Sequence, residues 1–267
     1  MIQTLVTSPG LGGSWARSIR RADQLAADAE STAPLLVFYG RLLRHQKAIH
    51  DALCAGPPSG SLERDLPLLE PPVAALLRDL VAEGPEPLAA EARALLTNGS
   101  TIAASLRIYC EARSDRQFVA KAVLQPYGPW LAGAGGIAPG PASFAARCPR
   151  CGSAPQLSIL GGAGSPADDG GGRQLLCAAC LTAWPFRRVL CPACGEEDER
   201  KLGYFRTSSF EHVRIDACDT CRRYLKSIDL GQLGLAVPLV DEVASAPLDL
   251  WARERGYEKI EANLVGL

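Results

Sequence analysis

The chain has 267 residues, a formal net charge of −1 and an apolar content of 47%. This near-neutral balance excludes a global electrostatic attraction to nucleic acid or to acidic lipid. No run of 18 apolar residues occurs, so no membrane insertion is expected. The N-terminus lacks the basic region and apolar core of a signal peptide, which favours a cytoplasmic protein.

The first part of the chain, residues 1–145, is expected to form a helical domain. Apolar residues recur there at helical spacing, and Pro and Gly residues bound the segments. The expected helices cover residues 14–32, 34–54, 71–84, 85–99, 100–112 and 114–133. Such a series predicts a helical bundle. A Gly/Pro-rich joint at 132–143 is expected to connect it to the rest of the chain.

Eight of the ten cysteines form four C-x-x-C pairs in the following region. The pairs are Cys148/Cys151, Cys177/Cys180, Cys191/Cys194 and Cys218/Cys221. A tight turn with two residues between the cysteines directs both sulfurs toward one point, and two such turns supply an S4 shell for zinc or iron. Structural disulfides would instead be typical of a small secreted chain. Metal ligation is therefore favoured, with redox-active dithiols as an alternative.

The cysteine region is internally repeated. Both halves open with C-P-x-C-G, at 148–152 and 191–195, and both reach a strand candidate before the second pair, at 173–177 and 212–218. This plan is that of a zinc ribbon or rubredoxin-like module. We expect one module over 146–190, a second over 191–230, and a tail over 231–267 that packs back on the protein.

These elements predict an α+β protein with a helical N-terminal domain, two tandem modules and a short C-terminal helix near 246–256. Consecutive pairing of the cysteine turns is favoured because each ribbon then closes over a similar length, while interleaved pairing is the main rival. Site one then comprises Cys148, Cys151, Cys177 and Cys180, and site two Cys191, Cys194, Cys218 and Cys221. A full S4 shell leaves no position for a catalytic water. No catalytic residues are predicted, and the chain is not expected to be an enzyme.

Several other residues near the cysteines or on the helices have an expected role. The arginines that flank the sites could offset thiolate charge or dock an acidic partner; they are Arg187, Arg188, Arg222 and Arg223. Cys54 and Cys110 are expected to be small core residues. His212 could border site two, although packing is favoured. The glycine-rich segment 161–172 lacks a phosphate-loop pattern and is expected to be a ribbon tip.

The cysteine segments together resemble one known family. The residues that carry the resemblance are CPRCGSAP at 148–155, LLCAACLTAWPFRRVLCPACG at 175–195, IDACDTCRRYLKSIDL at 215–230 and LDLWARERGYEKIEANLVGL at 248–267. With these segments the chain resembles the formate dehydrogenase accessory protein family, FdhE. The helical N-terminal half is of the same structural type as in this family, but it contains no specific sequence motif.

The resemblance implies a cytoplasmic maturation protein that binds the catalytic subunit of respiratory formate dehydrogenase during assembly. It also implies two rubredoxin-like iron sites formed by the eight paired cysteines, with zinc as the alternative metal. Two other functions stay open: a rubredoxin-like electron carrier or thiol oxidoreductase, and a nucleic-acid-binding zinc ribbon, although no nucleic acid partner is expected. A homodimer is also left open.

Overall fold

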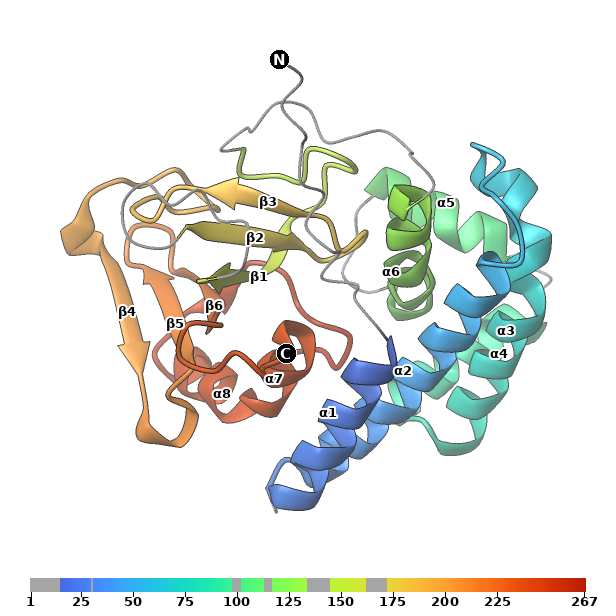
Figure 1. Cartoon of the computed structure of the whole chain (residues 1–267), viewed down its shortest axis with the longest axis horizontal. Helices are drawn as coiled ribbons and strands as arrows, with labels where there is room; N and C mark the ends of the chain where they lie inside the picture. The colour runs from blue at the N-terminus through green and yellow to red at the C-terminus, as the bar shows by residue number, and fades with distance from the viewer. Residues whose placement is uncertain (1–14, 30, 98–101, 113–116, 134–144, 162–171) are drawn as a thin grey trace. The chain divides into compact units, whose positions relative to one another are not determined.

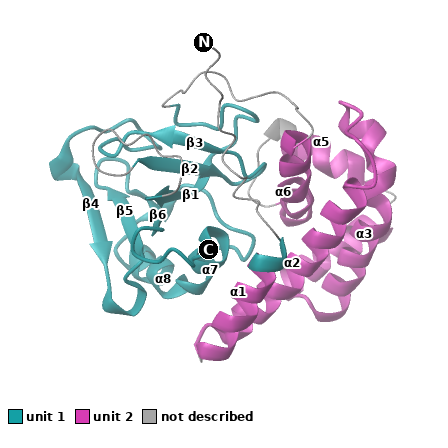
Figure 2. Ribbon diagram, in the orientation of Figure 1, with its two compact units in different colours: residues 1–17, 139–267 teal, residues 18–138 magenta. Residues whose placement is uncertain are grey.

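The computed structural model describes residues 15–29, 31–97, 102–112, 117–133, 145–161 and 172–267. The chain divides into two compact units, residues 18–138 and residues 1–17 together with 139–267 (Figure 2). Most of the predicted joint at 132–143 and of the predicted ribbon tip at 161–172 lies outside the described residues. In the described part of the chain, no helix is both long and apolar enough to span a membrane.

The unit of residues 18–138 is helical, and its first helix starts just before it (Figure 1). The helices are α1 (Trp15–Asp28), α2 (Ala33–Leu53), α3 (Leu62–Glu83), α4 (Glu86–Thr97), α5 (Ile102–Ala112) and α6 (Phe118–Gly133). Helix α2 supplies the buried stripe Leu36, Leu43 and Ile49, and it packs on α3 and α6. Burial of this stripe stabilises the bundle, because apolar area is removed from water along the whole length of the helix.

The expected start of the third helix at 71 is wrong, because α3 already begins at Leu62. Pro71 and Pro72 indicated a helix start, since proline lacks the N–H that a helix interior needs. In the structure, however, Leu69 and Val73 lie on either side of these prolines in one buried stripe. That burial keeps the segment helical across the proline pair.

The other unit, residues 1–17 and 139–267, is built in its described part on one sheet of seven strands. The strands are β1 (Pro155–Leu160), β2 (Arg173–Cys177), β3 (Ala183–Phe186), β4 (Leu202–Arg206), β5 (Val213–Cys218), β6 (Arg223–Asp229) and β7 (Glu258–Lys259). Their order is β3-β2-β1-β6-β5-β4, and β7 pairs with β6. Short 3-10 turns cover Glu199–Lys201 and Ser208–Phe210. The mixed α+β class, with a helical region before a sheet that carries the cysteines, is therefore observed.

The two predicted modules share this sheet. Their hairpins meet where β1 runs parallel to β6, with Leu157 opposite Lys226 and Leu160 opposite Asp229. Every residue of β1 is buried, as are the middle five residues of β6. Burial on both faces is typical of strands in a parallel arrangement, so these two strands form the centre of the unit.

Two short helices follow the sheet strands, α7 (Pro238–Ala244) and α8 (Ala246–Glu254). Helix α7 contacts β1 and β6. The sequence predicted only the helix near 246–256 and missed α7. All seven residues of α7 are buried, including Asp241 and Glu242. The helix therefore has no polar face, and the amphipathic pattern used to recognise helices is missing.

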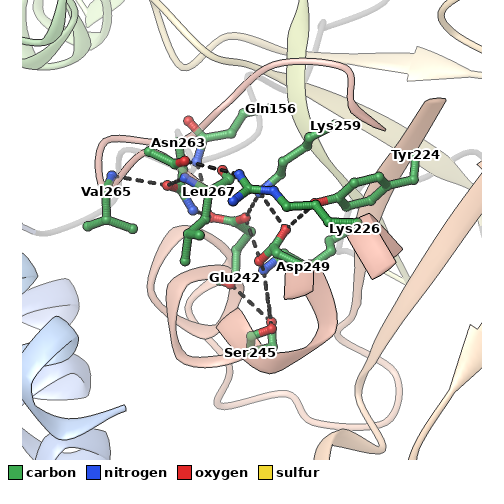
Figure 3. Close-up of polar contacts among 12 residues, drawn as sticks. Gln156, Tyr224, Lys226, Glu242, Ser245, Asp249, Lys259, Asn263, Val265 and Leu267 are labelled. Atoms are coloured by element: carbon green, nitrogen blue, oxygen red, sulfur yellow. Dashed lines mark hydrogen bonds and ion pairs between the residues drawn. The ribbon is translucent and has the colours of Figure 1, made fainter. Parts of the chain in front are cut away.

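A fully buried cluster of charges links β6 to these helices and to the C-terminal segment (Figure 3). Lys226 Nζ lies 3.1 Å from Glu242 Oε1, and Lys259 Nζ lies 3.1 Å from Asp249 Oδ1. The Tyr224 hydroxyl donates to Asp249 Oδ1 at 2.8 Å. Two ammonium groups thus balance two carboxylates, which offsets the large desolvation penalty of burying each one.

The sheet unit should become less stable toward unfolding when one charge of this cluster is removed. We expect Asp249→Asn to lower the free energy of unfolding by about 3–5 kcal/mol, because Lys226 and Lys259 would keep more buried positive charge than the cluster can neutralise. Urea titration of the purified protein measures this. As a control, Glu197→Gln breaks an exposed ion pair with Arg187 and should cost at most about 1 kcal/mol. Equal losses for the two variants would contradict the role given to the buried cluster.

Candidate metal centres

Site one forms where the turn before β1 meets the turn after β2. Cys148 Sγ lies 3.6 Å from Cys180 Sγ, and Cys151 Sγ lies 3.4 Å from Cys177 Sγ. The first turn is closed by the Gly152 N–H, which donates to the Cys148 carbonyl at 2.8 Å. All four sulfurs lie within 4.8 Å of one another. This site therefore combines the first and second C-x-x-C pairs.

Site two repeats this arrangement around β5. Cys191 Sγ lies 3.8 Å from Cys221 Sγ, and Cys194 Sγ lies 3.7 Å from Cys218 Sγ. The Gly195 N–H donates to the Cys191 carbonyl at 3.0 Å, as in the matching turn of site one. The structure thus brings the eight cysteines together in the consecutive grouping, and not in the interleaved one.

All four turns use the same backbone conformation after their second cysteine. Gly152 and Gly195 have φ of 74° and 79°, and the non-glycine residues Leu181 and Arg222 have φ of 54° and 58°. A left-handed backbone costs a non-glycine residue on the order of 1–2 kcal/mol, so the surrounding contacts must enforce it. The shared geometry indicates that the position of the sulfurs determines the turn.

The spacing of the sulfurs fits a tetrahedral metal ion. A metal–sulfur bond of about 2.3 Å gives a tetrahedron whose edges are about 3.8 Å long. The four sulfur–sulfur distances given above, 3.4–3.8 Å, are close to that edge. Each group could therefore hold one ion. Backbone N–H groups approach the sulfurs as well: those of Ala179 and Ala193 lie 3.4 Å from Cys177 Sγ and Cys191 Sγ.

The thiols of site one perturb one another strongly. Hydrogen bonds from Cys148, and then from Cys177 and Cys180, hold the pKa of Cys151 far below its usual value. The same contacts, first with Cys148 and then with Cys151, raise the pKa of Cys177 well above its usual value. One sulfur therefore ionises easily while a neighbour resists a second charge. A cation between the sulfurs would remove that conflict, because it stabilises all four thiolates.

The two sites differ in access to solvent. In site one, Cys148, Cys177 and Cys180 are buried and Cys151 is half-buried, whereas in site two Cys194 is exposed. Desolvation raises the pKa of Cys191. Desolvation also acts on Cys194, but hydrogen bonds from the Glu196 N–H and from the neighbouring thiols together outweigh it and lower the pKa of Cys194. An ion in site two would therefore be reached more easily by water and by other ligands.

The four flanking arginines do not form one free basic patch. The Arg187 guanidinium pairs with Glu197 at 2.8 Å, and Arg223 pairs with Glu258 at 3.4 Å. Arg222 lies over the Tyr257 ring, with 3.9 Å from Cζ to the centroid. It also pairs with Asp219 at 3.1 Å. Arg188 lines a cavity next to Cys191. These side chains thus support the turns around site two as well as facing solvent.

One other sequence expectation needs correction. Cys54 is exposed and not a core residue, because α2 ends at Leu53 and Cys54 is one step beyond its buried stripe. His212 has the packing role that the sequence favoured, since its Nε2 lies 2.9 Å from Asp241 Oδ1 on α7. The side chain of Cys110 lies outside the described residues.

The sequence analysis missed Arg173 and Arg214, which line the same cavity as Arg188. They are far apart in sequence, on β2 and β5. Only the parallel junction of the two hairpins brings these strands into one sheet, so no local signal in the sequence could have joined them.

Comparison with known proteins adds to this geometry. The family model for the FdhE C-terminal domain matches residues 189–265. The FdhE homologue of Aquifex aeolicus is 42% identical over 123 residues, which are 46% of this chain and 42% of the relative. That of Pseudomonas putida is 31% identical over 131 residues, 47% of this chain and 40% of the relative. These alignments thus span less than half the length of the curated relatives.

A solved structure matches nearly the whole chain. The crystal structure of the FdhE protein from Pseudomonas aeruginosa superposes with a TM-score of 0.67 and 25% identity, and the match covers 94% of this chain and 95% of that one. The resemblance to the FdhE family is confirmed. The FdhE match includes the helical region and the sheet unit alike. The matched proteins are all named as FdhE proteins.

The metal content of cysteine variants should show that the two cysteine groups bind metal independently of each other. We expect the purified protein to hold about two ions per chain, and Cys177→Ser and Cys218→Ser each to hold about one, because a tetrahedral site with three thiolates binds more weakly. Elemental analysis measures this. Cys54→Ser is the matched control and should keep both ions, since Cys54 lies outside both groups. Loss of both ions in either site variant would contradict two independent centres.

The ion in site two should leave first. On addition of a strong chelator we expect a fast and a slow phase of metal release, because Cys194 is exposed whereas the sulfurs of site one are mostly buried. A chromophoric chelator follows both phases. The fast phase should vanish in Cys221→Ser and persist in Cys180→Ser. The opposite assignment would show that burial of the sulfurs does not control release.

Proposed function

We propose that this chain is a cytoplasmic accessory protein that binds the catalytic subunit of respiratory formate dehydrogenase during assembly. We further propose that the eight paired cysteines hold two iron ions, with zinc as the alternative metal. The observation that carries this proposal is the pair of cysteine tetrads with tetrahedral edge lengths. They lie in a fold that the FdhE structure matches over 94% of this chain.

In this proposal the metal sites shape a binding surface. Four sulfur ligands complete the shell of the ion, so no bound water is left for hydrolysis. The ion would instead tie the turn at 191–195 to the turn at 218–222, in which Cys194 and Arg222 are exposed. Iron would add one-electron chemistry, whereas zinc would not. In both cases the cysteines position the loops that the partner would contact.

The flanking arginines are suited to an acidic partner surface. Arg187 and Arg223 pair with exposed carboxylates, on Glu197 and Glu258. Such surface pairs are worth about 0–1 kcal/mol each, so a partner carboxylate can compete for them. Charge complementarity of this kind would speed association and would be weakened by salt.

A second candidate function is a rubredoxin-like electron carrier. The exposed Cys194 favours it, because exposure brings an iron ion in site two near the protein surface. A thiolate-to-iron absorption band that bleaches on reduction would support this candidate. A colourless, zinc-loaded protein that still binds its partner would exclude it. We also predict that the protein has no nucleic acid partner. Whether it forms a homodimer is a prediction that the oligomeric state in solution would test.

Partner capture tests the main proposal. The tagged protein should retain the purified catalytic subunit of formate dehydrogenase from the same organism. We expect Cys191→Ser combined with Cys221→Ser to weaken this binding by about tenfold or more, which corresponds to about 1.4 kcal/mol, because the loops of site two lose their shared ion. Biolayer interferometry measures the affinity.

Cys54→Ser serves as the control here too and should bind like the unchanged protein. Equal binding by the double variant, with its loss of metal established, would show that site two does not shape the surface. No binding by the unchanged, metal-loaded protein would overturn the proposed function.

A further inference from the structure

In the described part of the chain, strand β4 lies at an edge of the sheet and pairs with β5 alone (Figure 1). Its last three residues, Tyr204, Phe205 and Arg206, are all exposed. Natural proteins usually protect such edges with charge, proline or a covering segment, because the main-chain groups of an edge can pair with another chain. An edge that instead exposes two aromatic side chains is suited to such pairing.

The hydrogen-bond pattern of the β4–β5 ladder determines which main-chain groups face outward. The Lys201 carbonyl accepts from the Asp219 N–H at 2.9 Å, directly before the first pair of the ladder. Hydrogen-bonded and non-hydrogen-bonded pairs alternate in an antiparallel ladder. The main-chain groups of Gly203 and Phe205 are therefore directed toward β5, whereas the N–H and C=O of Tyr204 point to the other side. An added strand could pair with these two groups.

A groove of about 540 Å³ lies beside this edge, within the sheet unit. Its lining comes from β4, from the 3-10 turn that follows it and from α8, and includes the aromatic side chains of Tyr204, Phe205, Phe210 and Trp251. The rings of Phe205 and Trp251 contact each other, with centroids 4.8 Å apart. Aromatic rings gain additional free energy from further apolar or aromatic neighbours. The groove therefore fits a large apolar side chain.

The charge of the groove fits an uncharged ligand. Among the described residues that line it, Arg206 alone is charged. The Arg206 guanidinium lies 3.5 Å from Asp229 Oδ2, so its charge already has a partner. A groove that is nearly neutral and largely aromatic offers little to a carboxylate or an ammonium group, because neither would recover its hydration free energy there.

The size of the surface indicates a single segment and not a second folded copy of this chain. The edge is one strand of five residues, and nine residues line the groove. A stable dimer buries about 800 Å² on each partner, contributed by roughly 20–30 residues. An extended segment needs less area, because it gains main-chain hydrogen bonds along the edge as well as side-chain contacts.

We propose that the outer edge of β4 and this groove bind an extended, uncharged segment of a partner chain, which adds as a further strand and places a large apolar side chain against Phe205 and Trp251. Main-chain pairing supplies affinity, and the groove selects the side chain. The inference goes beyond the proposed function, because the surface lies outside both cysteine groups and requires no particular client.

Fluorescence anisotropy of a labelled peptide, measured with the full, metal-loaded chain, tests the proposal. The probe is a C-amidated heptapeptide in which threonine alternates with valine, phenylalanine and valine. Two matched peptides carry N-methyl groups, one on every threonine and the other on the valines and the phenylalanine. An added strand directs alternate N–H groups toward its neighbour. We therefore expect the unmodified peptide to bind and one of the two methylated peptides to lose binding.

Variants of β4 separate the side-chain contribution from the main-chain contribution. Phe205→Ala should weaken peptide binding by about fivefold or more, because the groove loses one of its rings. Tyr204→Ala removes only a side chain, whereas Tyr204→Pro also removes the outward N–H. Proline is tolerated where the N–H faces away from the ladder. We expect Tyr204→Pro to bind about fivefold more weakly than Tyr204→Ala.

Leu235→Ala is the matched control, because Leu235 is 77% exposed in the same unit and does not line the groove. It should bind the peptide as the unchanged protein does. Metal content and circular dichroism verify that each variant is folded. Light scattering of the unchanged protein and of Tyr204→Pro measures whether a second copy occupies the edge.

The inference would be overturned if the unmodified peptide did not bind, if both methylated peptides bound equally well, or if Leu235→Ala weakened binding as much as Phe205→Ala. A dimer that Tyr204→Pro dissociates would identify a second copy as the occupant and would overturn the assignment to a partner segment. The outcome is distinct from that of partner capture. Peptide binding without client binding overturns the proposed function alone, whereas client binding without peptide binding overturns this inference alone.

Discussion

Four sulfur atoms that lie 3.4–3.8 Å apart in pairs cannot all carry charge unless a cation lies between them. This constraint determines the form of both cysteine sites. It explains the opposed pKa shifts of Cys151 and Cys177, and it explains why four turns of different sequence share one backbone conformation. Leu181 and Arg222 adopt a left-handed backbone that neither side chain favours, because the adjacent sulfurs must converge.

The second constraint is the parallel pairing of β1 with β6. It joins the two hairpins into one sheet and buries the central strands. Lys226 then has to find its partners within the protein, and it finds them on α7 and α8. The buried charges therefore specify which helices cover this part of the sheet. Such a cluster contributes less to net stability than to the choice of one arrangement, since misplaced partners would leave a charge unpaired.

The two metal sites have the same plan but different surroundings. Site one is mostly buried, whereas site two has an exposed cysteine, flanking arginines and an adjoining cavity. One copy of the duplicated unit is therefore more accessible to solvent than the other. The match of the FdhE C-terminal domain model to residues 189–265 covers site two and leaves site one outside.

Much of this protein could be predicted from the sequence because the relevant geometry is local. Two residues between cysteines determine how the sulfurs of one turn converge, and the similar spans between pairs favour consecutive grouping. Helical spacing of apolar residues placed most of the helices. Where a tertiary contact overrode a local preference, the prediction was wrong, as at Pro71 and Pro72 in α3.

Only the tertiary structure decided which residues from distant segments contact one another. The register of β1 against β6, the partners of Lys226 and the approach of Arg173 to Arg214 all depend on which strands pair. Strand pairing is a long-range choice that no short pattern encodes, because the same alternation of side chains fits several neighbours. The sequence by itself therefore determined the cysteine turns and their grouping, whereas the fold decided the surroundings that distinguish one group from the other.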